Sequence, residues 1–302
     1  MPVLVLSKKT GQVGNRLTVY AHCLAAAYAN GWRLHNPAFD EYSEFFVGPR
    51  LVLSSCAKPW KTPPSRRLRT MTYALARVLW EFAKVARWPT LGRIRTARAR
   101  NEVHLDLKAV MDAAIAGHCR VLVLQGYHFR HHGWFAPHAD AVRAFLAPAD
   151  PWASVGARAV AEVRARATVT GVEAPVVVGV HIRHGDYRQH LGGRFFWPVA
   201  TYAGFMRRMV ELLSPRPVAF LVCSNAVHKP DDFSGFVADF GPGHLVSDMA
   251  ALAQCNYILG PPSSFSSWAA FQGRNKLLRL EDPGEVFTLE RFETLATPDP
   301  WY

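Results

Sequence analysis

The chain has 302 residues, half of them apolar, which is enough to bury a large core and suits two domains better than one. The net charge of +12 favours an anionic partner, whether a nucleotide sugar, a nucleic acid or an acidic membrane surface. A compositional bias toward arginine and alanine explains the same excess, so charge alone does not choose among them. The longest apolar stretches are far shorter than the ~20 residues that span a bilayer, so we expect no transmembrane segment.

The amino terminus and the cysteines point to a cytosolic protein. The apolar segment Met1–Leu6 precedes Lys8 and Lys9, which is the reverse of the order in a signal peptide. We therefore expect a cytoplasmic chain, with peripheral contact at the inner membrane face as an option. Five scattered cysteines form no CxxC pair and predict small core residues rather than disulfides or a zinc site: Cys23, Cys56, Cys119, Cys223 and Cys255.

Short apolar runs alternate with helical patterns in the first half of the chain. Pro2–Leu6 predicts a buried strand, and a Gly/Asn loop leads from it to a helix over Leu17–Ala29. Val121–Gln125 predicts a second strand and Ala136–Leu146 a second helix. Prolines then interrupt the pattern, and we place a domain boundary there, giving domains 1–150 and 151–302.

The second half repeats this alternation. After a helix from about Trp152, the chain predicts three apolar strands, Val176–Ile182, Val218–Ser224 and Tyr257–Gly260. Helices are expected near Tyr202–Leu213 and Asp248–Gln254. Fully apolar strands separated by helices are typical of parallel sheets that are covered on both faces, so the sequence predicts an α/β chain.

A basic region covers residues 58–100. Residues 58–69 combine three prolines with five basic residues, and further arginines follow. Apolar residues recur at helical spacing through this region, at Leu68, Met71, Leu75, Val78, Leu79 and Phe82. Two interpretations stay open: a surface helix with a solvated basic face, or a docking surface for an anionic membrane or an acceptor.

The most specific motif is His-Ile-Arg-His-Gly-Asp-Tyr at residues 181–187, directly after an apolar strand. Alternation along a strand puts His181 and Arg183 on one side and turns Ile182 into the core. Ligands of open α/β sheets bind beyond the carboxyl ends of the strands. A guanidinium there can bind a diphosphate with two hydrogen bonds. Asp186 either orients Arg183 or caps the turn.

A serine-rich segment, Pro261–Trp268, follows the strand Tyr257–Gly260. Hydroxyls and free N–H groups at a helix start form an anion site, although simple helix capping explains the same residues. Because this segment and Arg183 both follow strands of one predicted domain, we expect them to share one diphosphate.

Between these motifs, Asp248 opens the predicted helix, either as its N-cap or as an acceptor for the N1–H and exocyclic amine of guanine. The strand end at Ser224 and Asn225 is expected to contact ribose or base. The histidines after Gln125 invite a zinc site, but no partner cluster has ligand spacing. We expect instead a basic, aromatic loop at a cleft.

The segment Gly11–Arg16 lies between the first strand and the first helix, and it fits neither the dinucleotide fingerprint nor the P-loop. Its two glycines permit close approach of a ligand, and Asn15 and Arg16 supply donors. An ordinary turn is the alternative.

Taken in order, these motifs resemble the α1,2-, α1,6- and protein O-fucosyltransferase superfamily, most strongly its bacterial α1,2-fucosyltransferase-like branch. The resemblance covers most of the chain through G-x-x-G-N-x-L at 11–17, Q-G-Y-x-F at 125–129, H-x-R-x-G-D-Y at 181–187 and D-x-x-x-L…S-S-F-S-x-W at 248–268. It implies a GT-B fold, with two Rossmann-like domains whose parallel sheets face a cleft. It further implies GDP-fucose as donor, inversion at the anomeric carbon, no metal or other cofactor, and a glycan or lipid-linked acceptor.

The resemblance also implies roles for single residues. Arg183 matches the arginine that binds the β-phosphate, Asp248 the guanine-binding aspartate and Asn15 the asparagine that faces the fucose; we take Arg183, Asp186 and Asn15 as catalytic. The nucleotide sugar is expected to contact the second domain and the first loop through Gly14, Asn15, His181, Arg183, Ser224, Asn225, Asp248, Ser263, Ser264 and Phe265. The acceptor is expected to contact Asp40, Tyr127, His128 and Arg130 of the first domain, and also His184 of the second.

The chain departs from the family at two points. His184 stands where many members have a second arginine, and no carboxylate matches the base of the α1,6 branch. Asp186, His184, His190 and Asp40 are candidate bases, and late proton loss without a base is the alternative. Transfer of another GDP-linked sugar and, from a different class, nucleic-acid binding are the competing functions.

Overall fold

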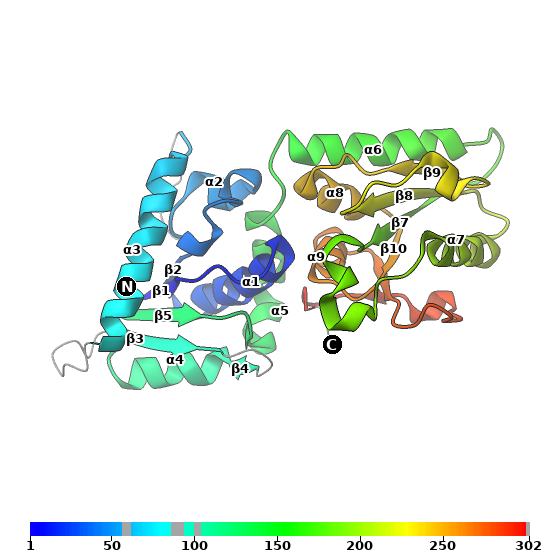
Figure 1. Ribbon diagram of the computed structural model, residues 1–302. Coiled ribbons are helices and arrows are strands. Elements are labelled where there is room, and N and C mark those ends of the chain that lie inside the picture. Colours follow the sequence, from blue (N-terminus) through cyan, green and yellow to red (C-terminus); the bar gives the residue numbers. More distant parts are fainter. Residues whose placement is uncertain (56–61, 86–93, 100–103, 300–302) are drawn as a thin grey trace. The chain divides into compact units, whose positions relative to one another are not determined.

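The computed structural model describes residues 1–55, 62–85, 94–99 and 104–299. The chain divides into two compact units, Met1–Ala149 and Asp150–Tyr302 (Figure 1). This division lies one residue before the boundary expected from the sequence. Each unit has its own sheet, and the prediction of an α/β chain with parallel sheets is confirmed.

The first unit contains a four-stranded parallel sheet in the order β2-β1-β5-β3. The inner strands β1 (Val3–Leu6) and β5 (Val121–Gln125) match the predicted strands. The outer strands β2 (Arg33–His35) and β3 (Ile94–Arg98) were not predicted. Both carry arginine, which an outer strand tolerates because part of its surface meets water. A separate two-stranded sheet joins β4 (Leu105–Asp106) and β6 (Phe129–Arg130).

Helices cover the first sheet. α1 (Val13–Asn30) packs against α5 (His132–Phe145), while α3 (Arg66–Val85) places Ala76 and Trp80 against Val5 and Val123 of the sheet (Figure 1). The remaining helices of this unit are α2 (Val47–Leu51) and α4 (Leu107–Ala116).

The start of α1 differs from the prediction. The helix begins at Val13, so Gly14 and Asn15 lie in its first turn and not in a loop. The reason is local: Gln12 has extended backbone at the N-cap position, and its carbonyl accepts the Arg16 N–H at 3.1 Å. α1 ends at Asn30 and is followed by the C-cap residue Gly31, whose φ of 64° is the left-handed conformation that glycine adopts freely.

The second unit contains a six-stranded sheet in the order β12-β11-β10-β7-β8-β9, parallel except for β12. The three central strands, β7 (Val176–Ile182), β8 (Val218–Ser224) and β10 (Tyr257–Gly260), match the predicted strands. Three strands were not predicted: the edge strands β9 (Val237–Phe240) and β12 (Glu293–Thr294), and β11 (Lys276–Arg279), which lies between β12 and β10.

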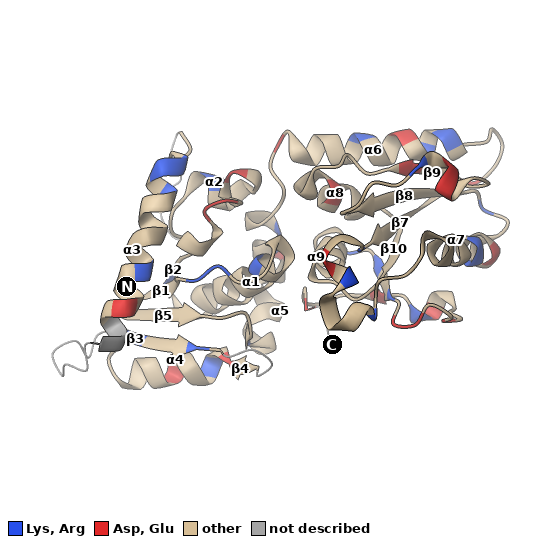
Figure 2. Cartoon of the chain, viewed as in Figure 1, with Lys and Arg blue, Asp and Glu red and all other residues tan. Residues whose placement is uncertain are grey.

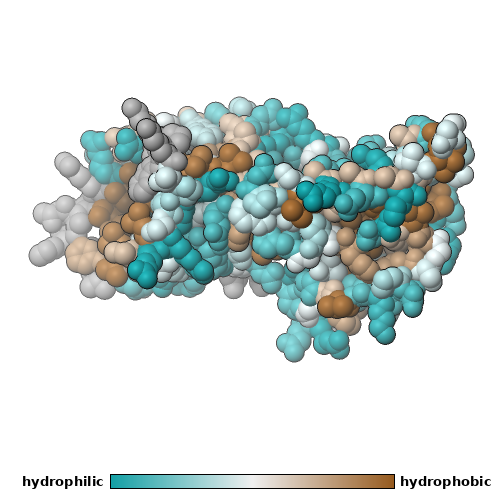
Figure 3. Space-filling view, turned by 90° about the horizontal axis from the view of Figure 1, so that it is seen from above, coloured by the Kyte–Doolittle hydropathy of each residue, from teal (hydrophilic) through white to brown (hydrophobic). Residues whose placement is uncertain are grey.

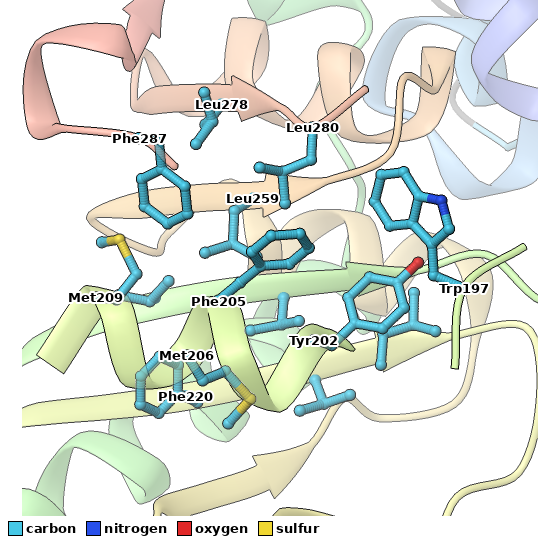
Figure 4. Packing of buried hydrophobic residues seen from close by; sticks show 14 of the residues in the cluster. Trp197, Tyr202, Phe205, Met206, Met209, Phe220, Leu259, Leu278, Leu280 and Phe287 are labelled. Carbon is cyan, nitrogen blue, oxygen red and sulfur yellow. The ribbon is translucent and has the colours of Figure 1, made fainter. Parts of the chain in front are cut away.

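The main core of the second unit lies between its sheet and α7 (Val199–Leu213). Tyr202, Phe205 and Met206 of α7 pack on Phe220 and Leu259 of the strands (Figure 4). Ile182 belongs to the same cluster, as the strand alternation predicts. Burying one such aromatic side chain contributes about 3 kcal/mol.

Three further helices complete the second unit: α6 (Trp152–Ala167), α8 (Leu245–Leu252) and α9 (Ser264–Gly273). α8 packs against both α6 and α9. A side chain at Gly179 of β7 would place its Cβ 2.5 Å from Leu252, so glycine there allows the close approach of α8. The prediction that Asp248 opens this helix is wrong, because α8 starts at Leu245 and Asp248 lies within it.

The described cysteines are free and buried: Cys23, Cys119, Cys223 and Cys255. Burial raises the pKa of the Cys23 and Cys255 thiols to about 12, so both stay protonated at neutral pH. Cys56 lies outside the described residues. None of the helices within the described ranges has the length and apolar composition needed to cross a bilayer.

Candidate functional site

Arg183 lies at the carboxyl edge of the second sheet. All seven residues of β7 are buried, and Arg183 is the first residue to leave the strand, with a side chain that is 12% exposed. Its Nη2 donates to both carboxylate oxygens of Asp186 at 2.7 Å. A carboxylate bonded in this way fixes the direction of the guanidinium. The arrangement favours the interpretation in which Asp186 orients Arg183.

Asn225 joins the loop after β7 to the loop after β8. Its Oδ1 accepts the His184 N–H at 2.9 Å, and its Nδ2 donates to Asp186 Oδ1 at 3.2 Å. Gly185 makes this contact possible, since a Cβ there would lie 2.5 Å from the Asn225 amide. Asn225 therefore helps to fix the position of Asp186, which in turn orients Arg183.

Tyr187 joins the loop after β7 to the loop after β10. The Arg183 guanidinium lies over the Tyr187 ring, 4.9 Å from its centre, and the Tyr187 hydroxyl donates to Pro262 O at 2.7 Å. Tyr187 belongs to the predicted motif, but no pattern in the sequence indicates that it contacts Pro262. It connects Arg183 to the segment that starts α9.

The two serines before α9 differ. Ser263 is the N-cap, and its buried hydroxyl accepts the Phe265 N–H at 3.2 Å, so the capping interpretation holds for it. Ser264 is the first residue of the helix and is partly exposed. Its hydroxyl and the N–H groups of the first turn are the donors that an anion can reach here.

His181 and Asp248 are buried groups with shifted pKa values. Burial, together with the nearby Arg183 charge, lowers the pKa of His181 to about 3, so its ring is neutral; it packs 5.1 Å from the Phe265 ring. Burial raises the pKa of Asp248 to about 6, although its Oδ1 accepts the Gly243 N–H at 2.9 Å. A buried carboxylate with one protein donor remains able to accept from a ligand.

His184 and Ser224 already have partners within the second unit. His184 Nε2 lies 2.7 Å from Trp197 O, and Ser224 Oγ lies 2.9 Å from His228 Nε2 while accepting the Ala226 N–H. If Ser224 contacts a nucleotide as expected, its hydroxyl must give up or share its hydrogen bonds with His228 and Ala226.

The first unit contains a cavity of about 530 Å³ at the carboxyl ends of β1, β3 and β5. It brings together the predicted residues Asn15, Tyr127 and His128, and a Cβ on Gly11 would meet the Asn15 amide at 2.2 Å. Gly14 is buried in the adjoining turn of α1. Gly126 lines the cavity and must be glycine, because its φ is +125° and a Cβ there would lie 2.5 Å from Ala99 O.

Two other residues expected on the acceptor side support the cavity from behind. Arg130 is buried and donates to the backbone oxygens of Tyr127 and Phe129 at 2.6 and 2.9 Å. Asp40 forms an ion pair with Lys9 at 2.7 Å. Both are therefore placed to position the loops.

Sequence reasoning missed the cations that line this cavity, Lys8, Lys9 and Arg98. Lys8 follows β1 closely, a position that the strand-end rule could have identified. Arg98 ends a strand that was not predicted, so no pattern drew attention to it. Among the described residues, no group of three or more histidine, cysteine, aspartate or glutamate side chains is arranged to hold a metal ion.

Comparisons with known proteins identify relatives of this chain. Galactoside alpha-(1,2)-fucosyltransferase 1 of Saimiri sciureus is 34% identical over 146 residues, which cover 45% of this chain and 38% of that protein. The Homo sapiens protein of the same name is 32% identical over 140 residues, covering 43% and 37%. The chain thus spans less than two fifths of the length of these relatives.

Solved structures share the fold. A mutant of Arabidopsis thaliana FUT1 in complex with GDP superimposes with a TM-score of 0.54 at 14% identity, covering 93% of this chain and 71% of that one. NodZ alpha-1,6-fucosyltransferase soaked with GDP-fucose gives 0.51 at 16% identity, covering 97% of each chain. At these identities the likeness shows the fold alone.

The sequence model of glycosyl transferase family 11 matches residues 128–283, which is more than half of the chain. The matched part contains β7, β8, β10 and the loops that hold Arg183, Asn225 and Ser264. Together with the α1,2-fucosyltransferase relatives, this match confirms the resemblance indicated by the ordered motifs. The chain belongs to glycosyl transferase family 11.

Proposed function

We propose that this protein transfers fucose from GDP-fucose to a hydroxyl acceptor, with inversion at the anomeric carbon and without a metal ion. The observation that carries the proposal is the Arg183 guanidinium, held by Asp186 at the carboxyl end of β7 and joined through Tyr187 to the start of α9. One structural neighbour is in complex with GDP and another was soaked with GDP-fucose. Membership of a glycosyl transferase family favours group transfer over nucleic-acid binding.

In the proposed reaction the bond between the fucose anomeric carbon and the β-phosphate oxygen breaks while the acceptor oxygen bonds to that carbon. Negative charge grows on the β-phosphate. Arg183, the Ser264 hydroxyl and the first N–H groups of α9 are fixed in advance to receive it. His181 and Phe265 flank the nucleotide, and Asp248 accepts from guanine.

The acceptor proton leaves late in this proposal, to the departing phosphate or to water. Asp186 forms an ion pair with Arg183, and Asp40 forms one with Lys9. His184 is engaged with Trp197 O through Nε2. His190 is exposed, like Asp186, and packs its ring 5.1 Å from that of Tyr187; among the described residues it forms no ion pair.

A donor screen tests the proposal. We expect hydrolysis or transfer from GDP-fucose, and much slower turnover of GDP-mannose, UDP-galactose and CMP-sialic acid, because guanine and the 6-deoxy sugar are both recognised. Product release is measured by chromatography, first with water and then with a glycan array as acceptor. Preference for GDP-mannose would replace fucose by another sugar, and activity with no GDP-sugar would overturn the proposal.

Treatment with EDTA is expected to leave turnover within twofold of its untreated value, because Arg183 and the start of α9 supply the positive charge. The rate is measured with saturating GDP-fucose before and after chelation, and again after adding Mn²⁺ or Mg²⁺. Loss of activity on chelation with recovery on adding metal would contradict a metal-independent reaction.

We also propose that α3 contacts an anionic membrane surface. Met71, Leu75, Val78 and Phe82 are each more than half exposed and lie on one face at helical spacing. Apolar side chains gather over the part of the first unit that carries α3 (Figure 3). Residues 58–61, 86–93 and 100 of the basic region lie outside the described residues.

The membrane contact predicts binding to vesicles of phosphatidylcholine mixed with phosphatidylglycerol in a sedimentation assay. Leu75→Ser with Val78→Ser is expected to weaken binding tenfold or more, since each side chain contributes about 1.5 kcal/mol or more on insertion. Val227→Ser with Val286→Ser changes two exposed valines of the second unit and is the control. Equal binding by both double variants would exclude α3 as the contact.

A further inference from the structure

The cavity of the first unit has a cationic lining. Lys8, Lys9 and Arg98 line it, and no aspartate or glutamate is among its lining residues. Lys9 is neutralised by Asp40 and Glu41, at 2.7 and 3.1 Å. Lys8 and Arg98 are exposed, and neither forms an ion pair with another described residue. Figure 2 shows basic residues directly after β1 and at the end of β3, where these two side chains arise.

A residue with a buried, unpaired donor belongs to the wall of the same cavity. Gln125, the last residue of β5, is 4% exposed, and its Nε2 has no hydrogen-bond partner among the described residues. Leaving a buried polar group unpaired costs about 1–3 kcal/mol. A ligand oxygen placed against Nε2 removes that cost, so the donor favours an occupant with oxygen acceptors.

Tyr127 gives the cavity a fixed aromatic wall. The Arg130 guanidinium lies 4.6 Å from the Tyr127 ring centre and also bonds the Tyr127 carbonyl, so the ring is supported from the side of the protein. Sugar rings present C–H groups that pack on aromatic faces, and binding sites combine such a face with a few polar groups that set orientation.

We infer that this cavity binds the acceptor, and that the acceptor is a saccharide carrying a negatively charged group, either a carboxylate or a phosphate. Lys8 and Arg98 bind the anionic group, Gln125 Nε2 donates to a ring or hydroxyl oxygen, and the sugar packs on Tyr127. Asn15 lines the same cavity and can donate to the bound sugar. Naming the ligand an acceptor rests on the proposed fucosyl transfer; the anion selectivity of the cavity does not.

The test compares three monosaccharides that share a ring: galactose, galacturonic acid and galactose 6-phosphate. Binding to the full chain is measured by calorimetry or ligand-observed NMR, without any donor. We expect one or both anions to bind at least tenfold more tightly than galactose, and added NaCl to weaken only the anions. The stronger anion distinguishes a carboxylate from a phosphate acceptor.

Matched variants locate the effect. Lys8→Gln with Arg98→Gln is expected to reduce anion binding to the level of galactose. Arg33→Gln with Arg120→Gln removes the same charge from exposed residues at the amino ends of β2 and β5 and is expected to keep the preference. Melting temperatures show that both variants are folded, and the salt dependence of the unchanged protein gives an answer that needs no variant.

The inference is overturned if the two anions bind no better than galactose, if neither binds measurably, or if both double variants lose the preference equally. It is also overturned if Lys8→Gln with Arg98→Gln weakens GDP as much as the anionic sugars, since the cations then serve the donor diphosphate. Failure of the donor screen with anion selectivity intact would remove fucosyl transfer and leave an anionic-saccharide site.

Discussion

Arg183→Ala is expected to lower turnover at saturating GDP-fucose by a hundredfold or more, with a much smaller loss of GDP affinity. The β-phosphate gains charge only as the glycosidic bond breaks, so the contact with Arg183 strengthens on the way to the transition state. Losing one such fixed donor costs about 3 kcal/mol. Turnover is measured by product formation and GDP affinity by calorimetry.

Arg183→Lys is expected to recover little of this loss, because an ammonium group cannot reproduce the planar donor set that Asp186 holds. Asp186→Asn leaves the guanidinium in place but loosens it, and is expected to cost less than Arg183→Ala. Arg216→Ala is the control, since Arg216 pairs with Glu173 near the amino end of β8, at the opposite edge of the same sheet. Near-normal turnover of Arg183→Ala would make Arg183 a structural residue and remove the central group of the proposed mechanism.

Asp248→Asn is expected to bind GDP tens of times more weakly while making the free protein more stable. Hydrogen bonds from guanine to a charged acceptor contribute about 1.5–3 kcal/mol each. The raised pKa of about 6 means that, without ligand, burial disfavours the charged form. The folded state therefore holds a proton that the unfolded state releases, and stability falls as pH rises from about 4 to about 6. At pH 7 the neutral amide of Asp248→Asn avoids the free-energy cost of burying a charged carboxylate, which is up to roughly 3 kcal/mol.

The pH dependence of GDP binding gives a second measurement on Asp248. Guanine donors require the carboxylate form, so GDP affinity should fall about tenfold per pH unit below 6 and level off above it. ADP and UDP should bind weakly at every pH, and melting curves should shift by several degrees with GDP alone. If Asp248→Asn kept the full preference for GDP over ADP, guanine recognition would belong to another residue.

The inner strands were predictable because burial on both faces leaves a continuous apolar run. Val121–Gln125, Val176–Ile182, Val218–Ser224 and Tyr257–Gly260 all have the predicted bounds. The edge strand β3 was missed because arginine interrupts its apolar run, and β11 was missed because only two apolar residues stand between its terminal lysine and arginine. Their pairing is decided by neighbours far along the chain, such as Val121 opposite Ile94, and that information is not local.

The sequence predicts which residues of the candidate site lie at the ends of strands, but it does not predict which of them contact one another. Placing Arg183, Asn225 and Ser264 at the ends of neighbouring strands follows from the parallel order. The partners do not: Asn225 and Asp186 are 39 residues apart, and Tyr187 and Pro262 are 75 apart. The cap formed by Ser263 and the support given by Arg130 depend on burial, which single residues in a sequence do not reveal.

The strand orders give the two units a common design. In each sheet the first strand of the unit has its successor on one side and a later strand on the other: β2 and β5 flank β1, while β8 and β10 flank β7. The strand order therefore reverses at β1 and at β7. At such a reversal the chain segments that follow the two neighbouring strands run to opposite sides of the sheet, and a crevice opens between them. This crevice depends on the connectivity of the strands and not on particular side chains. Lys8 and Gln125 flank the first reversal, and Arg183 and Ser263 flank the second. Loops at the ends of β9 and β11 hold none of these four residues, so exchanging them for loops of related enzymes is a route to new sugar specificities that leaves the proposed anion sites in place.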